Sequence, residues 1–126
     1  ELRKDLEQII HPEVHSIINK QTFESQEPYQ IIVIPLLIET GYQNFVDRVL
    51  IIDCSLETQL ARLMNRDDEK LESARKIVAN QIERKERLKF ADDIIENEKK
   101  TSISVLKKKV LQLHNTYLEL SENSLI

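Results

Sequence analysis

Two apolar stretches decide the fold of this chain: VIPLLIE at Val33–Glu39 and VDRVLIID at Val46–Asp53. Each is short, rich in branched apolar residues, and ends on a carboxylate, Glu39 or Asp53. Such runs are typical of buried parallel strands, and open α/β sheets bind ligands at the carboxyl ends of these strands. A helical pattern with two arginines, ETQLARLMNRD, follows at Glu57–Asp67. This order of elements predicts an α/β fold with a parallel sheet and right-handed crossovers.

The apolar stretches also predict where the elements begin and end. We expect buried strands at Ile31–Leu37 and Val49–Asp53, with a short helical turn at Glu39–Phe45 between them. Pro35 lies near the end of the first strand, where the loss of one ladder hydrogen bond is tolerated. Gly41 is available for an unusual backbone angle in the turn.

Helical spacing dominates the chain outside these strands. Apolar residues predict helix over Leu2–Phe23, interrupted at His11-Pro12 because proline suits the first turn of a new helix. Ser55 is expected to cap a charged helical segment, Leu56–Phe90, which Asp67-Asp68 breaks in two.

The last part of the chain is expected to return to the sheet. Ile94-Ile95, flanked by acidic residues, predicts a very short third strand, and Thr101 is expected to cap a long amphipathic final helix. The chain thus divides into a helical part, 1–27, core strands, 28–55, a helical segment, 56–90, and a short strand with the final helix, 91–126.

Composition restricts the classes of function. The 126 residues are 40% apolar and 32% charged, which allows a packed core, and the net charge of −4 favours neither nucleic acid nor an anionic membrane. No apolar run approaches the ~20 residues that span a bilayer, and no signal peptide is evident. The single cysteine, Cys54, excludes an internal disulfide and fits a reducing cytoplasm. Lys107-Lys108-Lys109 lacks interleaved aromatic residues, so a nucleic-acid surface is not expected.

Arginines are concentrated in one segment, which holds five of the seven: Arg62, Arg66, Arg75, Arg84 and Arg87. Arg62 and Arg66 are four residues apart and therefore share a helix face. Guanidinium groups match phosphate oxygens, so this face is suited to closing over a polyphosphate. The alternative is a solvated face that pairs with neighbouring carboxylates, as many exposed charge runs do.

The strand-end carboxylates have two interpretations as well. Glu39 and Asp53 are suited to holding a magnesium-bound water or a ligand hydroxyl, or else each caps the helix that follows. His11 and His15 are also four residues apart, but no third ligand is evident and Glu13 is misplaced for a zinc motif. We therefore expect no protein-bound metal centre.

Nearly the whole chain, about Leu2–Leu120, carries short motifs in a definite order. They are His11-Pro12, Pro35-Leu36-Leu37 with Glu39, Asp47-Arg48-Val49, Glu57-Thr58-Gln59-Leu60 with Arg62, Arg66-Asp67, Gln81, and Ala91-Asp92-Asp93-Ile94-Ile95 with Asn97. In order and spacing these motifs resemble bacterial dephospho-CoA kinases. The resemblance implies a P-loop kinase fold with a parallel sheet, a helical coenzyme-binding region and a mobile helical lid. It implies transfer of the γ-phosphate of ATP, with Mg²⁺, to the ribose 3′-hydroxyl of dephospho-CoA, the last step of coenzyme A synthesis.

The resemblance also implies roles for single residues. Arg62 occupies the place of the lid arginine that approaches the phosphates, and Arg66 is its neighbour in ATP binding. Asn97 lies in the segment that passes adenine, and His11-Pro12 is the family's His-Pro at the coenzyme. Glu39 matches a family glutamate that is expected to order magnesium-bound water or substrate. By the same resemblance, 1–27 ends the coenzyme-binding region and 56–90 is the lid.

This sequence departs from the family pattern at the phosphate site. It lacks a G-x-x-x-x-G-K-[ST] loop and the Asp-Ala-Asp segment that supplies the presumed base, and its one glycine is Gly41. The family's first strand, which lies between the strands expected here, is missing too. We therefore expect a longer native protein, an incomplete sheet, and no turnover by this polypeptide alone.

Two other functions remain open. One is a different nucleotide or nucleoside kinase of the same fold, and the other is a non-catalytic helical module that binds a protein partner through the Lys-rich final helix. The kinase interpretation implies small-molecule partners, ATP and dephospho-CoA, without nucleic acid or membrane, and leaves an oligomer open.

Overall fold

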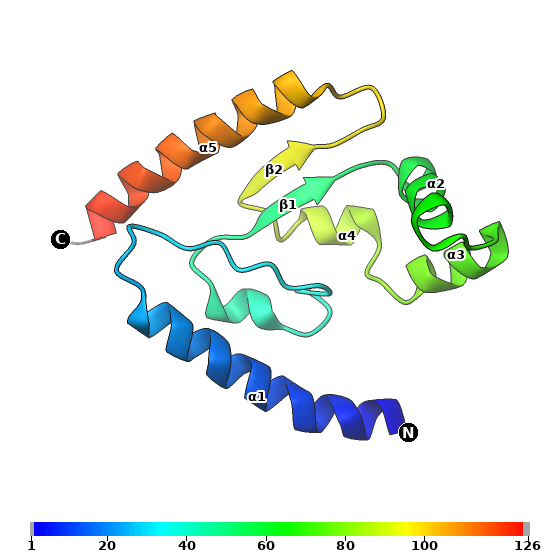
Figure 1. Cartoon of the computed structure of the whole chain (residues 1–126), viewed down its shortest axis with the longest axis horizontal. Helices are drawn as coiled ribbons and strands as arrows, with labels where there is room; N and C mark the ends of the chain where they lie inside the picture. Colours follow the sequence, from blue (N-terminus) through cyan, green and yellow to red (C-terminus); the bar gives the residue numbers. More distant parts are fainter. Residues whose placement is uncertain (1, 125–126) are drawn as a thin grey trace. The chain divides into compact units, whose positions relative to one another are not determined.

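The computed structural model describes the backbone of residues 2–124 and the side chains of residues 12–123. These residues form two compact units, one running to Ile32 and resuming at Thr116, the other comprising Val33–Asn115. The elements in chain order are α1 (Leu2–Glu24), η1 (Tyr42–Phe45), β1 (Leu50–Asp53), α2 (Leu56–Asp67), α3 (Leu71–Ala79), α4 (Arg84–Leu88), β2 (Asp93–Glu96) and α5 (Ile103–Ser124) (Figure 1). Across the described residues, no helix is both long and apolar enough to cross a membrane.

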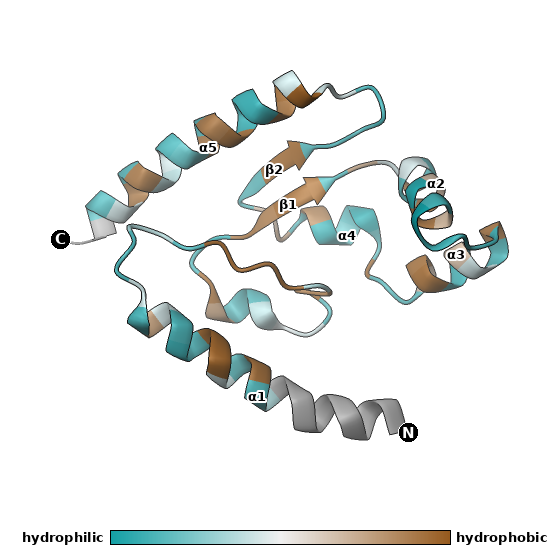
Figure 2. Cartoon of the chain, in the orientation of Figure 1, coloured by the Kyte–Doolittle hydropathy of each residue, from teal (hydrophilic) through white to brown (hydrophobic). Residues whose placement is uncertain are grey.

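The sheet of the second unit consists of β1 and β2, which pair in parallel. Leu50 lies opposite Asp93, and Asp53 lies opposite Glu96. Both strands are apolar over most of their length, and the segment between them is helical (Figure 2). The expected parallel α/β arrangement, the strand before Ser55 and the short strand at Ile94-Ile95 are thus confirmed.

Polar side chains fasten the two strands at their amino ends. The Arg48 guanidinium donates two hydrogen bonds to the Asp93 carboxylate, at 2.8 and 3.0 Å. The Asp92 carboxylate accepts a hydrogen bond from the Val49 N–H at 2.7 Å. At the carboxyl end, the Asn97 N–H donates to the Asp53 carbonyl at 2.7 Å. Because a two-stranded pair is marginal by itself, these contacts help to fix the register.

A small apolar core lies on one face of the strands. Ile38, Val49 and Ile51 are buried together, and partly buried residues pack around them: Leu37, Val46, Ile82, Leu88 and Ala91. Ile52 points the other way and is 56% exposed, as period-2 alternation requires. Its partner in the register, Ile95, shares that face and is 4% exposed, whereas Ile94 beside Ile51 is 44% exposed. Each face is therefore buried at one strand and exposed at the other, and the expectation of strands buried on both faces is confirmed only in part.

The stretch Ile31–Leu37 is not a strand, contrary to its apolar pattern. Within the part of the chain that the structure describes, no strand pairs with it, and Val33 is 86% exposed. Leu36 has a positive φ of 57°, and its carbonyl accepts hydrogen bonds from the N–H and hydroxyl of Thr40, at 3.0 and 2.8 Å. Residues 35–40 form turns because Pro35 lacks an N–H and the backbone groups bond locally.

The turn that follows agrees better with expectation. Gly41 has a φ of 79°, the left-handed region that glycine adopts without steric cost, and η1 begins directly after it. The helical turn expected at Glu39–Phe45 is therefore present as turns followed by the 3-10 helix.

The helix ends show two further corrections. α1 continues through Pro12 instead of restarting there, so the expected interruption at His11-Pro12 is wrong, and the helix bears the loss of the one hydrogen bond that Pro12 cannot donate. The Ser102 hydroxyl caps α5 by accepting a hydrogen bond from the Val105 N–H at 3.2 Å, so Ser102 and not Thr101 is the capping residue. The Thr101 hydroxyl instead accepts from the Glu98 N–H at 3.1 Å.

The charged segment after Ser55 folds as the pattern indicates. The Ser55 hydroxyl accepts a hydrogen bond from the Thr58 N–H at 3.2 Å and caps α2. Asp68 ends α2 in the left-handed conformation with a φ of 52°, which aspartate tolerates. α2 and α3 then pack against each other, and α4 follows.

Candidate functional site

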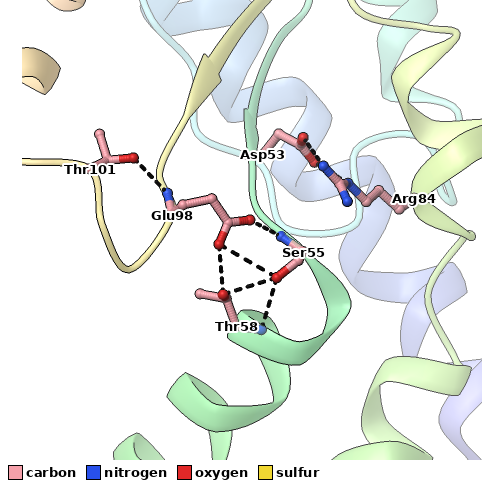
Figure 3. Close-up of polar contacts among 6 residues, drawn as sticks. All are labelled: Asp53, Ser55, Thr58, Arg84, Glu98 and Thr101. Carbon is pink, nitrogen blue, oxygen red and sulfur yellow. Dashed lines mark hydrogen bonds and ion pairs between the residues drawn. The ribbon is translucent and has the colours of Figure 1, made fainter.

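The site lies at the carboxyl ends of β1 and β2, where open parallel sheets bind ligands. Asp53, the last residue of β1, is 6% exposed, and Arg84 from α4 reaches it. The guanidinium donates two hydrogen bonds to the carboxylate, at 2.8 and 3.0 Å (Figure 3). The hydrogen bond and charge of Asp53 raise the pKa of Arg84 above its already high value, so Arg84 is a permanent cation at this edge.

Glu98 connects the turn after β2 to the start of α2. One carboxylate oxygen accepts from the Ser55 N–H, and the other accepts from the Thr58 hydroxyl at 2.7 Å (Figure 3). The Thr58 hydrogen bond, followed by that of the Ser55 N–H, lowers the pKa of Glu98. Glu98 is therefore held as the carboxylate at neutral pH.

Arg62 and Asn97 meet at the same edge. One terminal nitrogen of Arg62 donates a hydrogen bond to the Asn97 carbonyl at 2.6 Å. A guanidinium has five N–H donors, so this bond leaves most of them for a ligand. Two of the residues singled out from the sequence are thus brought together at the edge.

Two other predicted site residues lie differently. Arg66 donates two hydrogen bonds to its neighbour Asp67, both at 2.7 Å, and its side chain is 74% exposed. The hydrogen bond raises the pKa of Arg66 and lowers that of Asp67, but solvent screens such a pair. Glu39 is exposed in the turn at residues 35–40, and no described contact joins it to Arg62 or Asn97.

The residues assigned to the coenzyme belong to the first unit. Pro12 is exposed inside α1, and the side chain of His11 lies outside the described residues. Among the side chains that the structure describes, no group of three or more His, Cys, Asp or Glu is arranged to hold a metal ion.

Arg84 and Glu98 were not identified from the sequence as site residues. Arg84 is one of five arginines in a helical segment, and nothing in its spacing distinguishes it. Glu98 does have a faint signal. The capping sequence Ser55-Leu56-Glu57-Thr58 lacks the glutamate or glutamine that normally follows three residues after the cap, so an acceptor from elsewhere was a reasonable expectation.

The arrangement is suited to holding an anion. Arg62 supplies a fixed cation, whereas the charge of Arg84 is balanced by Asp53, and an open cavity of about 390 Å³ nearby is lined by Glu96, Glu98, Lys99 and Lys100. Asp53 and Glu98 already bind donors within the chain, so neither carboxylate is available as an isolated charge. A guanidinium group at the end of a parallel sheet is suited to binding phosphate oxygens and unsuited to binding a cation.

Comparisons with known proteins agree with this chemistry. A family model for dephospho-CoA kinase matches residues 1–102. The dephospho-CoA kinase of Pasteurella multocida is 42% identical over 118 residues, which cover 92% of this chain and 57% of that protein.

Two solved structures are similar in fold. The Thermus thermophilus protein TT1252 has a TM-score of 0.81 at 26% identity, covering 91% of this chain and 59% of that one. A dephospho-CoA kinase from Campylobacter jejuni has a TM-score of 0.61 at 31% identity, covering 97% and 59%. The chain thus spans less than two thirds of each relative. These matches confirm the resemblance seen in the sequence: the chain belongs to the dephospho-CoA kinase family.

Proposed function

We propose that this chain acts within an ATP-dependent kinase that phosphorylates the ribose 3′-hydroxyl of dephospho-CoA. The observation that carries the proposal is the hydrogen bond between Arg62 and the Asn97 carbonyl at the carboxyl edge of the sheet. This hydrogen bond holds the permanent positive charge of Arg62 at the edge where phosphoryl transfer is proposed to occur. Membership of the dephospho-CoA kinase family supplies the substrates, ATP and dephospho-CoA.

Arg62 is the proposed catalytic cation. A phosphoryl group in transfer spreads negative charge over its oxygens, and a preorganised guanidinium stabilises that charge. Because its bond to Asn97 uses one donor, the remaining N–H groups are available to the phosphate. Asn97 is half-buried beside it and is proposed to line the adenine side. Arg66, exposed one turn further along α2, is proposed to contribute more weakly to ATP binding.

The substrate side is proposed from the family resemblance. His11 and Pro12 in α1 would contact the coenzyme, so that 1–27 forms the end of the coenzyme-binding region. Glu39 follows the Pro35-Leu36-Leu37 motif and would order magnesium-bound water or substrate. Because the Glu39 side chain is exposed in the turn, it is accessible to a ligand and does not pack in the core.

We propose that 56–90 is the lid, attached to the core parts 28–55 and 91–126. Contacts at both ends of the segment support this division. Thr58 binds Glu98 at the start, whereas Arg84 binds Asp53 and Leu88 joins the apolar core at the end. Between these attachments, α2 and α3 pack against each other and would move as one piece.

The described residues do not fit a magnesium site. Asp53 is bound by Arg84, Glu98 is bound by Ser55 and Thr58, and no acidic group of three is assembled among the described side chains. Nor does the printed sequence contain a G-x-x-x-x-G-K-[ST] loop to cradle the triphosphate. We therefore expect Mg²⁺ to accompany ATP through groups other than these, and this polypeptide by itself to be inactive.

The cytoplasm is the proposed location. The one cysteine, Cys54, is a free, half-buried thiol at the end of β1. A thiol at that point suits a reducing compartment, where it would persist unmodified.

A coupled assay of ADP formation tests the proposed function, using the full-length natural protein that carries this sequence. ATP should be consumed with dephospho-CoA and not with nucleoside monophosphates. Arg62→Ala should lower kcat by about 10³-fold, the scale of arginines that stabilise a transferring phosphoryl group. Arg75→Ala, which removes an exposed arginine of α3, should leave kcat unchanged. Near-normal turnover by Arg62→Ala would remove Arg62 from the mechanism, and preference for a nucleoside monophosphate would make the protein a different kinase.

A further inference from the structure

Helix α2 has an incomplete local cap. Ser55 caps the helix with its hydroxyl, but the residue three positions later is Thr58, where a complete capping box has glutamate or glutamine. In a capping box, that acidic side chain reaches back to the N–H of the capping residue. Thr58 is too short to do so, and the Ser55 N–H needs another acceptor.

Glu98 supplies that acceptor from the turn after β2. Its carboxylate accepts the Ser55 N–H, and it also accepts the Thr58 hydroxyl at 2.7 Å and lies 3.5 Å from the Ser55 hydroxyl (Figure 3). The Glu98 backbone is itself held, because its N–H donates to the Thr101 hydroxyl. A residue 43 positions from Ser55 thus completes the cap of α2.

A second contact joins the same two segments one helical turn further on. Arg62 is four residues after Thr58 and so lies on the same face of α2. Its guanidinium donates to the carbonyl of Asn97, the residue before Glu98. Residues 97 and 98 therefore hold α2 at two points about 6 Å apart along the helix axis. Two such points fix the direction of a helix, whereas one would act as a pivot.

We propose that Glu98 is a positioning residue: its carboxylate completes the cap of α2 and also ties α2 to the turn after β2, and this tie holds the Arg62 guanidinium at the reaction edge. The effect of Glu98 on catalysis rests on the proposed function. Its effect on the position of α2 rests on the contacts alone. Without the Glu98 carboxylate, the first turn of α2 loses its external acceptor. Arg62 is then held by a single bond to a backbone carbonyl, and its guanidinium samples other positions.

The lowered pKa of Glu98 agrees with this arrangement. Hydrogen bonds from Thr58 and Ser55 favour the carboxylate form, which is the form that can accept both at once. The negative charge also lies at the N-terminus of α2, where the helix dipole favours an anion.

Hydrogen exchange of this chain tests the structural link. In Glu98→Ala, the amides of the first turn of α2 should exchange about tenfold faster, the loss expected when a cap is removed. Glu96 is exposed and lies two residues before Glu98. Glu96→Ala removes an equal charge and should leave this exchange unchanged. Unchanged exchange in Glu98→Ala, or equal acceleration in Glu96→Ala, would overturn the inference.

A rescue variant separates positioning from capping. Thr58→Glu in the Glu98→Ala background puts a glutamate at the capping-box position, so the first turn of α2 should regain its protection from exchange. It does not restore the tie to residue 98. In the full-length protein we expect kcat to fall by about 10²-fold in Glu98→Ala, with the KM for dephospho-CoA unchanged, and to stay low in the double variant.

The outcomes distinguish this inference from the proposed function. Recovery of kcat in the double variant would mean that Glu98 only caps the helix, and positioning would be wrong. If the unaltered protein does not phosphorylate dephospho-CoA, the proposed function fails, while the exchange measurements still decide whether Glu98 holds α2.

Discussion

Two segments of this chain look alike in sequence and differ in structure: the stretch that ends at Glu39 and the stretch that ends at Asp53. Both are short apolar runs closed by a carboxylate. The second forms β1, and its carboxylate is 6% exposed and bound by Arg84. The first forms no strand in the described part of the chain, turns at residues 35–40, and leaves its carboxylate exposed.

The difference follows from partners and not from composition. β1 has β2 beside it, so the N–H and C=O groups on that edge are paired along the ladder. The stretch Ile31–Leu37 has no such neighbour among the described residues, and Leu36 and Leu37 use their carbonyls in local turns. An apolar run therefore predicts burial of some side chains, but a strand requires a second strand to pair with.

The largest expected difference between the two segments is how much the free energy of unfolding falls when an isoleucine in each is replaced by alanine. Ile51→Ala in β1 removes side-chain volume from the buried core and should cost about 2–3 kcal/mol. Ile31→Ala, at a side chain that is 65% exposed, should change it by less than about 0.5 kcal/mol. Urea unfolding of the two variants measures both. Equal losses would mean that Ile31 is buried in solution.

The carboxylates at the ends of the two segments should differ next. Asp53→Asn keeps the shape of the side chain but removes the charge that Arg84 binds. It should cost about 1.5 kcal/mol, the lower range for a hydrogen bond to a charged group, because the Arg84 side chain is 45% exposed. Glu39→Gln, at an exposed turn, should stay within about 0.5 kcal/mol. Thermal unfolding compares the pair, and a loss in Glu39→Gln matching that in Asp53→Asn would break the contrast.

The turn that replaces the first predicted strand has its own test. Gly41→Ala should cost about 1 kcal/mol, because an L-residue at a φ of 79° is strained. No atom lies within 4 Å of the added Cβ, so backbone strain alone accounts for the loss. Gly41→Asn should lose less, since asparagine tolerates this conformation. If both variants unfold like the unaltered chain, the left-handed turn is not populated in solution.

The smallest effect, seen only in acid, concerns Glu98 in the turn after β2. The pKa of Glu98 is lowered from its ordinary 4.5, chiefly by the Thr58 hydrogen bond, so the unfolded chain binds this proton more readily than the folded chain. The contribution of Glu98 to stability is then complete above pH 4.5 and is lost as pH falls through the lower folded pKa. Unfolding free energies of the unaltered chain and Glu98→Gln should converge in acid. A difference that is independent of pH would contradict this assignment.

Much of the second unit could be predicted from local signals. Val49–Asp53 and Ile94-Ile95 are bounded by polar residues that allow only a short strand, and Ser55 is a common capping residue before a helical pattern. Asp67-Asp68 breaks that pattern because aspartate can adopt the left-handed end of a helix. Each of these features depends on residues within a few positions of one another, which is why the sequence alone suffices.

The site was predicted less completely. Arg62 was singled out by its spacing from Arg66 and by family resemblance, Asn97 by family resemblance alone, and the structure brings the two together. Arg84 and Glu98 were missed because their partners, Asp53 and Ser55, lie 31 and 43 residues away. Local spacing carries no information on such distant pairs. Pro12 was misread as well: α1 continues through it, although a proline inside a helix removes one hydrogen bond and usually kinks or breaks the helix.

The amino-acid sequence by itself determined the family of this protein, its parallel strand–helix order, the cap at Ser55 and the glycine turn at Gly41. These follow from short-range preferences of backbone and side chain. Only the tertiary structure decided which apolar run becomes a strand, which arginine binds Asp53, and that Glu98 completes the cap of α2. The physical reason is that buried hydrogen-bonding groups must find partners, and folding, not sequence order, decides which distant groups are within reach.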